Sequence, residues 1–170
     1  MRCLPLLALL VAAACTTETT TDTGQLTGFE DRMFADCQDA GGTTYSCGLR
    51  VTVSGGQIHA LGLFNDGATG GPSATGALTE AAQAELADVI AQIPMETPGT
   101  VHDVGCGGAP LRSTSLDVLF DHNGTRHFDI EYASDGPMAE LNTYVSDLVT
   151  EIRTCSGSRV TFDGCTANMP

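Results

Sequence analysis

The sequence contains no lysine, and its positive charge comes from seven arginines alone. Against them stand 21 aspartate and glutamate residues, which give the chain a formal net charge of −14 at pH 7. Because a surface of this sign repels phosphate backbones, the composition excludes nucleic acid as a partner. The acid excess is typical of a soluble surface, and it would also suit cations or a basic protein partner.

Several catalytic motifs are missing as well. The chain has no Gly-x-Ser-x-Gly elbow, no His-Glu-x-x-His motif, no phosphate-binding loop and no Cys-x-x-Cys pair. Each of these patterns places a nucleophile, a metal or a phosphate in a defined geometry, so their absence removes the enzyme classes built on them. We therefore expect a domain that is not an enzyme and that carries no cofactor.

An apolar run of eleven residues, 4–14, follows a lone Arg2 and ends in small residues directly before Cys15. This layout is typical of an export signal. The run is too short for a transmembrane helix, which needs about 20 apolar residues. The small residues followed by a cysteine resemble the lipobox of bacterial lipoproteins. That resemblance implies that 1–14 is a signal peptide and that Cys15 is acylated, for instance with palmitate. An ordinary signal cut after Ala14 is the alternative.

The segment 15–28 is polar and rich in threonine, which predicts a tether between the lipid and a folded domain. Without the signal, six arginines remain against 21 acids, a formal charge of −15. The lipoprotein resemblance implies that the chain contacts the lipid bilayer through Cys15 and lies in the cell envelope, facing away from the cytoplasm. Thr16 is not acidic, and in that family this favours the outer membrane where a cell has one. A protein partner in the envelope also fits.

Residues 29–170 are enough for a single domain with its own core. An exported setting favours disulfides, but five cysteines cannot all pair within one chain. The five cysteines are Cys37, Cys47, Cys106, Cys155 and Cys165. A bond between Cys37 and Cys47, or between Cys155 and Cys165, would close a short loop. A bond between Cys106 and Cys155 is equally open.

The apolar periodicity predicts an α+β fold, in which two successive ββα units form an antiparallel sheet with both helices packed on one face. A short helix is expected to precede them from Thr27, because Thr27 to Glu30 has the form of a capping box. The expected elements are strands near 49–53 and 58–64, a loop over 65–76, a helix from N-cap Thr79 to Pro94, strands over 116–120 and 128–132, a helix from Pro137 capped by Gly157, and an edge strand over 159–162. The apolar residues of 58–64 fall on both faces of that strand, which indicates either a strand covered on both sides or a bulge near Gly62.

The second hairpin allows a register to be predicted, because its apolar residues all have even numbers. A three-residue loop of His122, Asn123 and Gly124, with Gly124 left-handed, pairs Asp121 with Thr125 and places all apolar residues on one face. Val118 would then face Phe128, and Leu116 would face Ile130. The other face would gather Asp117, Asp121, Thr125, His127, Asp129 and Glu131.

The carboxylates of that polar face are the candidates for a metal. Oxygen ligands of this kind suit a hard cation such as calcium. A solvated outer face of an antiparallel sheet explains the same residues, and we favour it, so no metal is predicted. The four candidates are Asp117, Asp121, Asp129 and Glu131.

These patterns together predict an exported, membrane-anchored lipoprotein that serves as a non-catalytic binding or envelope-associated module. One alternative is a thiol-dependent enzyme in which His102 activates Cys106, although a disulfide at Cys106 is favoured in an exported protein. The other alternative is a protease inhibitor that acts through the 65–76 loop, although this loop lacks a large anchoring side chain.

Overall fold

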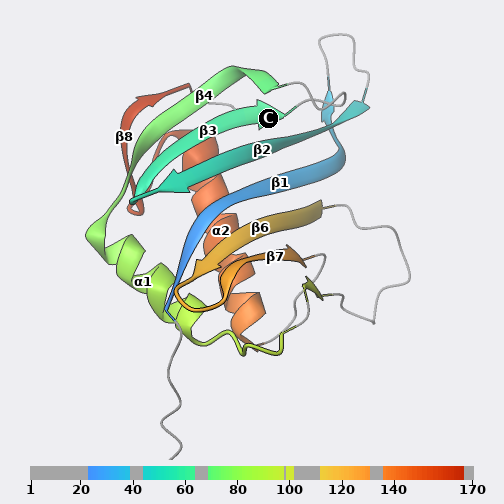
Figure 1. The fold of residues 1–170 in the computed structure, drawn as a ribbon. Coiled ribbons are helices and arrows are strands. Elements are labelled where there is room, and N and C mark those ends of the chain that lie inside the picture. The colour runs from blue at the N-terminus through green and yellow to red at the C-terminus, as the bar shows by residue number, and fades with distance from the viewer. Residues whose placement is uncertain are drawn as a thin grey trace, which may run out of the picture.

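The computed structural model describes residues 23–38, 44–63, 69–97, 99–101, 112–130 and 136–166. This part of the chain forms one sheet of eight strands in the order β5-β7-β6-β1-β2-β3-β4-β8, together with two helices (Figure 1). The elements are β1 (Gly24–Gln38), β2 (Thr44–Ser54), β3 (Gln57–Leu63), β4 (Thr69–Leu78), α1 (Glu80–Ala91), β5 (Thr100–Val101), β6 (Arg112–Phe120), β7 (Gly124–Ile130), α2 (Gly136–Thr154) and β8 (Val160–Cys165).

The predicted arrangement of two ββα units is wrong. Seven strands form a mostly antiparallel sheet, and the two-residue β5 adds to its edge in parallel with β7. Residues 27–37, expected to include a helix, lie in β1, which pairs with β2 on one side and β6 on the other. Residues 69–76, expected to be loop, lie in β4, between β3 and β8. Four consecutive strands therefore precede the first helix.

The first residues of β1 explain this correction. Phe29 and Asp31 are buried, whereas Glu30 between them is half-buried and Arg32 is exposed. This alternation has the period of a strand, and pairing on both sides satisfies the backbone of β1. The capping-box pattern at Thr27 is a local preference only, and tertiary pairing overrides it.

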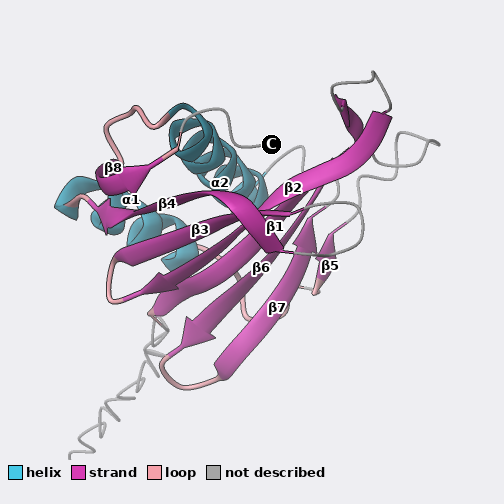
Figure 2. Cartoon of the chain, turned by 90° about the horizontal axis from the view of Figure 1, so that it is seen from above, coloured by secondary structure: helices cyan, strands magenta, loops and turns pink. Residues whose placement is uncertain are grey.

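One core joins the sheet to both helices. Figure 2 shows α1 and α2 on the same side of the sheet. Their buried side chains form a single cluster with those of the strands. The predicted start of α1 is confirmed: the Thr79 side chain accepts a hydrogen bond from the Ala82 N–H, and the helix ends at Ala91, before Pro94. The predicted edge strand is confirmed as β8, and a register shift on β3 spans the predicted bulge at Gly62.

In the hairpin of β6 and β7, even-numbered residues pair with even-numbered residues as predicted, but each partner lies two residues away from the predicted one. Its loop is 121–123, so Leu116 pairs with Phe128 rather than with Ile130. Gly124 is left-handed as expected, with φ of 69°. Even positions still pair with even positions, so the apolar residues of both strands remain on the buried face.

The C-terminus of α2 differs from the expected glycine cap. The left-handed residue is Cys155, with φ of 51°. The Ser156 N–H donates to the Glu151 carbonyl at 3.1 Å, which is the long hydrogen bond of a Schellman cap. Gly157 has a different role, because a Cβ there would lie 2.0 Å from the Glu151 carboxyl carbon. Only a glycine at this position leaves room for the Glu151 side chain, which reaches the Arg159 N–H.

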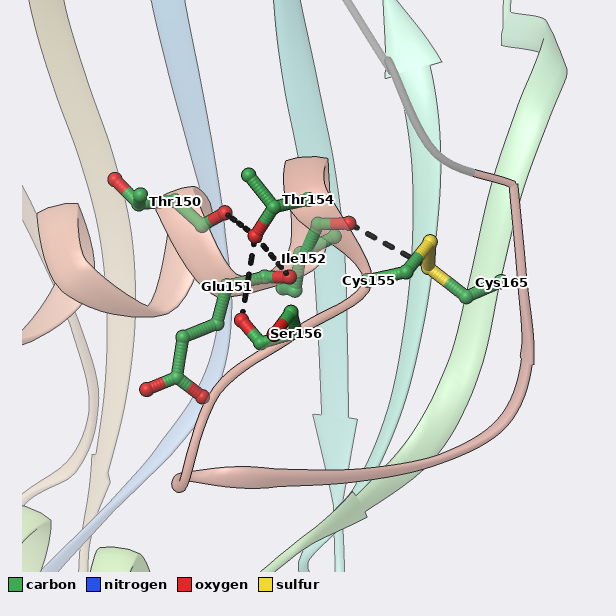
Figure 3. The surroundings of a disulfide bond; sticks show 7 residues. All are labelled: Thr150, Glu151, Ile152, Thr154, Cys155, Ser156 and Cys165. Carbon is green, nitrogen blue, oxygen red and sulfur yellow. Dashed lines mark hydrogen bonds between the residues drawn. A yellow bond between two sulfur atoms is a disulfide. The ribbon is translucent and has the colours of Figure 1, made fainter.

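A disulfide between Cys155 and Cys165 fixes this end of α2 to β8 (Figure 3). The Ile152 carbonyl lies 3.5 Å from the Cys165 sulfur. In addition, the Glu151 carboxylate accepts from the Arg159 N–H at 2.8 Å, just before β8 begins. The edge strand is therefore held both covalently and by hydrogen bonds.

Within the described part of the chain, neither helix is long and apolar enough to cross a membrane.

Candidate binding face of the sheet

The sheet has a covered face and an open face. The covered face packs against α1 and α2, and no described helix lies over the other one (Figure 2). We call the second surface the open face. It carries the alternate residues of each strand, among them the exposed Arg50, Thr52 and His59. Residues on this face reach solvent from the rigid centre of the sheet, which is where binding groups are held most firmly.

A hollow of about 490 Å³ lies on the open face where β1 lacks a side chain. The strand register aligns Thr52, Gly28, Asp117 and His127 in one row across β2, β1, β6 and β7. Gly28 leaves a gap in this row between Thr52 and Asp117. A bulge between Leu26 and Gly28 accompanies the gap.

Glu30 and Arg50 form one wall of the hollow, and Arg32 lies beside them. The Arg50 Nε lies 2.5 Å from one Glu30 carboxylate oxygen, and an Arg32 Nη lies 2.7 Å from the other. Partial burial alone would raise the pKa of Glu30, but hydrogen bonds and charge from the two arginines lower it overall. Glu30 is therefore ionised at neutral pH and holds both guanidinium groups in place.

The opposite wall contains an imidazole between two carboxylates. His127 Nδ1 lies 2.7 Å from an Asp117 oxygen, and Nε2 lies 3.3 Å from an Asp129 oxygen. The hydrogen bond with Asp117 is the main cause that raises the pKa of His127, and the Asp129 charge adds to it. The Ser115 hydroxyl donates to Asp129 at 2.6 Å and not to the imidazole. This geometry fixes charges and does not prepare a serine nucleophile, which requires a hydroxyl bonded to an acceptor nitrogen of histidine.

The structure describes three of the four metal candidates, and only two of these lie close to each other. Asp117 and Asp129 flank His127, but Asp121 lies in the β6–β7 turn, hydrogen-bonded to Thr23, and Glu131 is outside the described residues. No group of three or more suitable side chains that could hold a metal occurs in the parts of the chain that the structure describes.

The cysteines are resolved in part. One of the predicted short-loop pairs, Cys155 with Cys165, is formed. Cys47 is buried and disulfide-bonded too, to a cysteine whose side chain is outside the described set. Cys15 and Cys106 lie outside the described residues, so the fate of the odd thiol stays a prediction.

The two alternative sites have different outcomes. His102 lies outside the described residues together with Cys106, and their pairing stays a prediction. The 65–76 segment is not a free loop, since its residues from Thr69 onward belong to β4 inside the sheet. A strand hydrogen-bonded on both sides cannot enter a protease cleft as an exposed loop does, so this correction weakens the inhibitor interpretation.

Sequence reasoning anticipated one half of the open face and missed the other. The grouping of Asp117, His127 and Asp129 followed from the parity of the hairpin. The hollow at Gly28 and the ion pairs of Glu30 were missed because a helix was predicted for these residues. The alternation of residues 28–32 is the signal that could have revealed them.

The comparisons with known proteins add no family to this geometry. No protein-family description matches the chain, and no curated protein or solved structure shows a significant resemblance to it.

Proposed function

We propose that the protein is an exported, membrane-anchored module that binds a polar ligand on the open face of its sheet and does not catalyse a reaction. The hollow at Gly28 is the observation that carries this proposal. It is bounded by side chains of both charges on a sheet whose other face is fixed by a helical core. The anchor rests on the lipobox resemblance at Cys15.

The walls of the hollow favour a ligand with both donors and acceptors. Arg50 presents a guanidinium on one side, with 44% of its side chain exposed, and Asp117 presents a carboxylate on the other, with 50% exposed. Thr27 and Thr52 also line the hollow, and the Thr27 hydroxyl donates to the Asp117 backbone carbonyl at 3.2 Å. A volume near 490 Å³ is in the range of small-molecule sites. The lining is more polar than most such sites, so we expect specificity from hydrogen bonds rather than high affinity.

Binding rather than catalysis is favoured because each reactive-looking group already has a partner of opposite charge. Both nitrogens of His127 face carboxylates, and the hydrogen bond with Asp117 raises the pKa of the imidazole, which favours its charged form over the neutral form that a general base requires. Such fixed ion pairs orient a ligand without moving protons.

A photo-crosslinking amino acid at position 52, incorporated in the full chain in its own cells, tests the binding face. Thr52 lines the hollow, whereas Thr150 is an exposed threonine on α2 outside it, and it serves as the matched control. We expect a discrete crosslinked species from position 52 and none from position 150. Equal crosslinking at both positions, or none at position 52, would contradict the proposal.

The anchor is tested by replacing Cys15. We expect the wild-type protein to sediment with membranes and the Cys15→Ser variant to appear in the soluble fraction, because the acyl chains need the thiol. Identical fractionation of the two proteins would remove the lipoprotein part of the proposal and leave the binding face untouched.

A further inference from the structure

One end of the sheet carries the start of the described chain together with exposed apolar side chains. We call this end the tether pole and define it by Thr23–Gly24, the β2–β3 turn at Gly55–Gly56, the β6–β7 turn at 121–123, Leu119 and Met95. Figure 1 places the first residues of β1 next to the β6–β7 turn, and the β2–β3 turn lines the same cleft as these residues. The Asp121 N–H donates to the Thr23 carbonyl at 3.0 Å, which fixes the start of the chain to the β6–β7 turn.

The two exposed large hydrophobic residues of the described chain both lie at this pole. Leu119 and Met95 are each 41% exposed. Leu119 stands on the open side of β6, one residue before the strand ends. The Met95 sulfur lies 4.0 Å from the Asn123 amide nitrogen, which places it beside the β6–β7 turn. An exposed apolar group of this kind marks a contact surface more often when several gather at one place.

A cleft of about 570 Å³ opens at the same pole. It runs between the start of β1, the β2–β3 turn and α1. Apolar side chains from five elements contribute to its lining, namely Leu26, Val53, Leu78, Leu86 and Leu119. The pole therefore combines exposed hydrophobic side chains with an apolar recess behind them.

The length of the chain before this pole determines what can cover it. Thr23 follows Cys15 by eight residues, which span at most about 29 Å when fully extended. An acyl chain on Cys15 therefore keeps the tether pole within about 30 Å of the bilayer surface. The tether makes docking on the bilayer an intramolecular event. A contact that is too weak to bind the free protein to a membrane is therefore strong enough to dock the anchored protein.

We propose that the tether pole docks on the bilayer that holds the acylated Cys15, an inference that rests on the proposed anchor. Leu119 and Met95 enter the interfacial layer, and the strands rise from the membrane with the open face directed sideways. Exposed acids lie beside the contact, among them Glu96 and Asp121. The contact consequently suits a zwitterionic surface and not a strongly anionic one.

The wild-type chain has no tryptophan, so one introduced indole reports from one place. The test uses the full-length lipidated protein reconstituted in phosphatidylcholine vesicles whose acyl chains carry bromine, a contact quencher. Leu119→Trp places the indole at the pole. Ser113→Trp is the matched control, because Ser113 lies on the same strand and the same face, about 20 Å away. That separation exceeds the 5–10 Å depth at which interfacial groups insert, by roughly twofold.

We expect the brominated lipid to quench the indole at position 119 at least about twofold more than at position 113. Met95→Trp gives a second reporter at the pole and should behave like position 119, even if the Leu119 variant folds poorly. Quenching at positions 95 and 119 that is absent, or no greater than at position 113, in protein whose mass includes the acyl chains, would overturn the docking. A mass without acyl chains would instead refute the anchor itself, so the two failures are distinguishable.

Discussion

The two faces of the sheet are made by the same strands and carry opposite chemistry. On β2, Leu49, Val51 and Val53 are buried under the helices, whereas Arg50 and Thr52 between them are exposed. The covered face contributes most of the stability, because apolar burial is the dominant favourable term in folding. The open face contributes little to the stability of the fold, so its residues can serve binding without destabilising the protein. We therefore expect substitutions on the covered face to lower the free energy of unfolding much more than substitutions on the open face.

The largest difference is expected on β7. Phe128 is fully buried, and Phe128→Ala should lower the free energy of unfolding by about 3–5 kcal/mol, because a cavity replaces a packed ring. Thr125→Ala on the exposed side of the same strand should change it by no more than about 0.5 kcal/mol. Urea unfolding followed by circular dichroism measures both. Similar losses for the two variants would contradict the division of roles between the faces.

Adjacent carboxylates on β1 sharpen the comparison. Asp31 is fully buried, with an Arg153 Nη 3.4 Å from its carboxylate. Asp31→Asn should cost about 3 kcal/mol, because it removes a buried carboxylate charge that faces a largely buried guanidinium. Glu30→Gln, on the open face, should cost less than about 1 kcal/mol, since its ion pairs are partly solvated. The same unfolding experiment decides, and a larger loss for Glu30→Gln would reverse our interpretation of the two faces.

The disulfide at the edge of the sheet is expected to have an intermediate effect. Cys155 and Cys165 are ten residues apart, and replacing both by serine should cost about 2–3 kcal/mol by releasing a constraint on the unfolded chain. Thermal unfolding of this double variant measures the loss. The bond closes α2 onto β8 and does not touch the hollow. Crosslinking from position 52 should accordingly persist in the folded variant, and its disappearance would show that the edge and the open face are coupled.

The smallest expected effect is a dependence on pH at the open face. The folded-state pKa of His127 is raised, so its pairing stabilises the protein fully below about pH 6.5, its unfolded value, and this contribution is lost as the pH rises through the folded value. The side chain is 57% exposed, so solvent screening keeps the contribution below about 1 kcal/mol. His127→Gln should flatten the unfolding free energy between pH 6 and 8, roughly the range of histidine titration. An unchanged slope in this variant would show that the ion pairs do not form in solution.

Sequence reasoning succeeded where local patterns and tertiary pairing agree. The cap at Thr79 and the parity of the β6–β7 hairpin were both predicted from short-range signals that the fold preserves. The error of two residues in the hairpin pairing arises because parity decides which face is buried, while the exact pairs depend on the geometry of the turn.

Sequence reasoning failed where long-range pairing decides. β1 pairs with β6, about 90 residues later in the chain, and no local feature of 27–37 signals that partner. β4 is similar, because its many small residues are typical of a loop until β3 and β8 pair with it on both sides. The hollow at Gly28 depends on both neighbours of β1, so it could be seen only once the sheet was assembled.

The membrane anchor can be tested by the intact mass of the protein purified from its own membranes, before and after reduction. We expect a chain that begins at Cys15, carries the mass of acyl chains and contains the disulfide between Cys155 and Cys165. A chain that begins after Ala14 without added lipid, or one that retains residues 1–14, would contradict the anchored module.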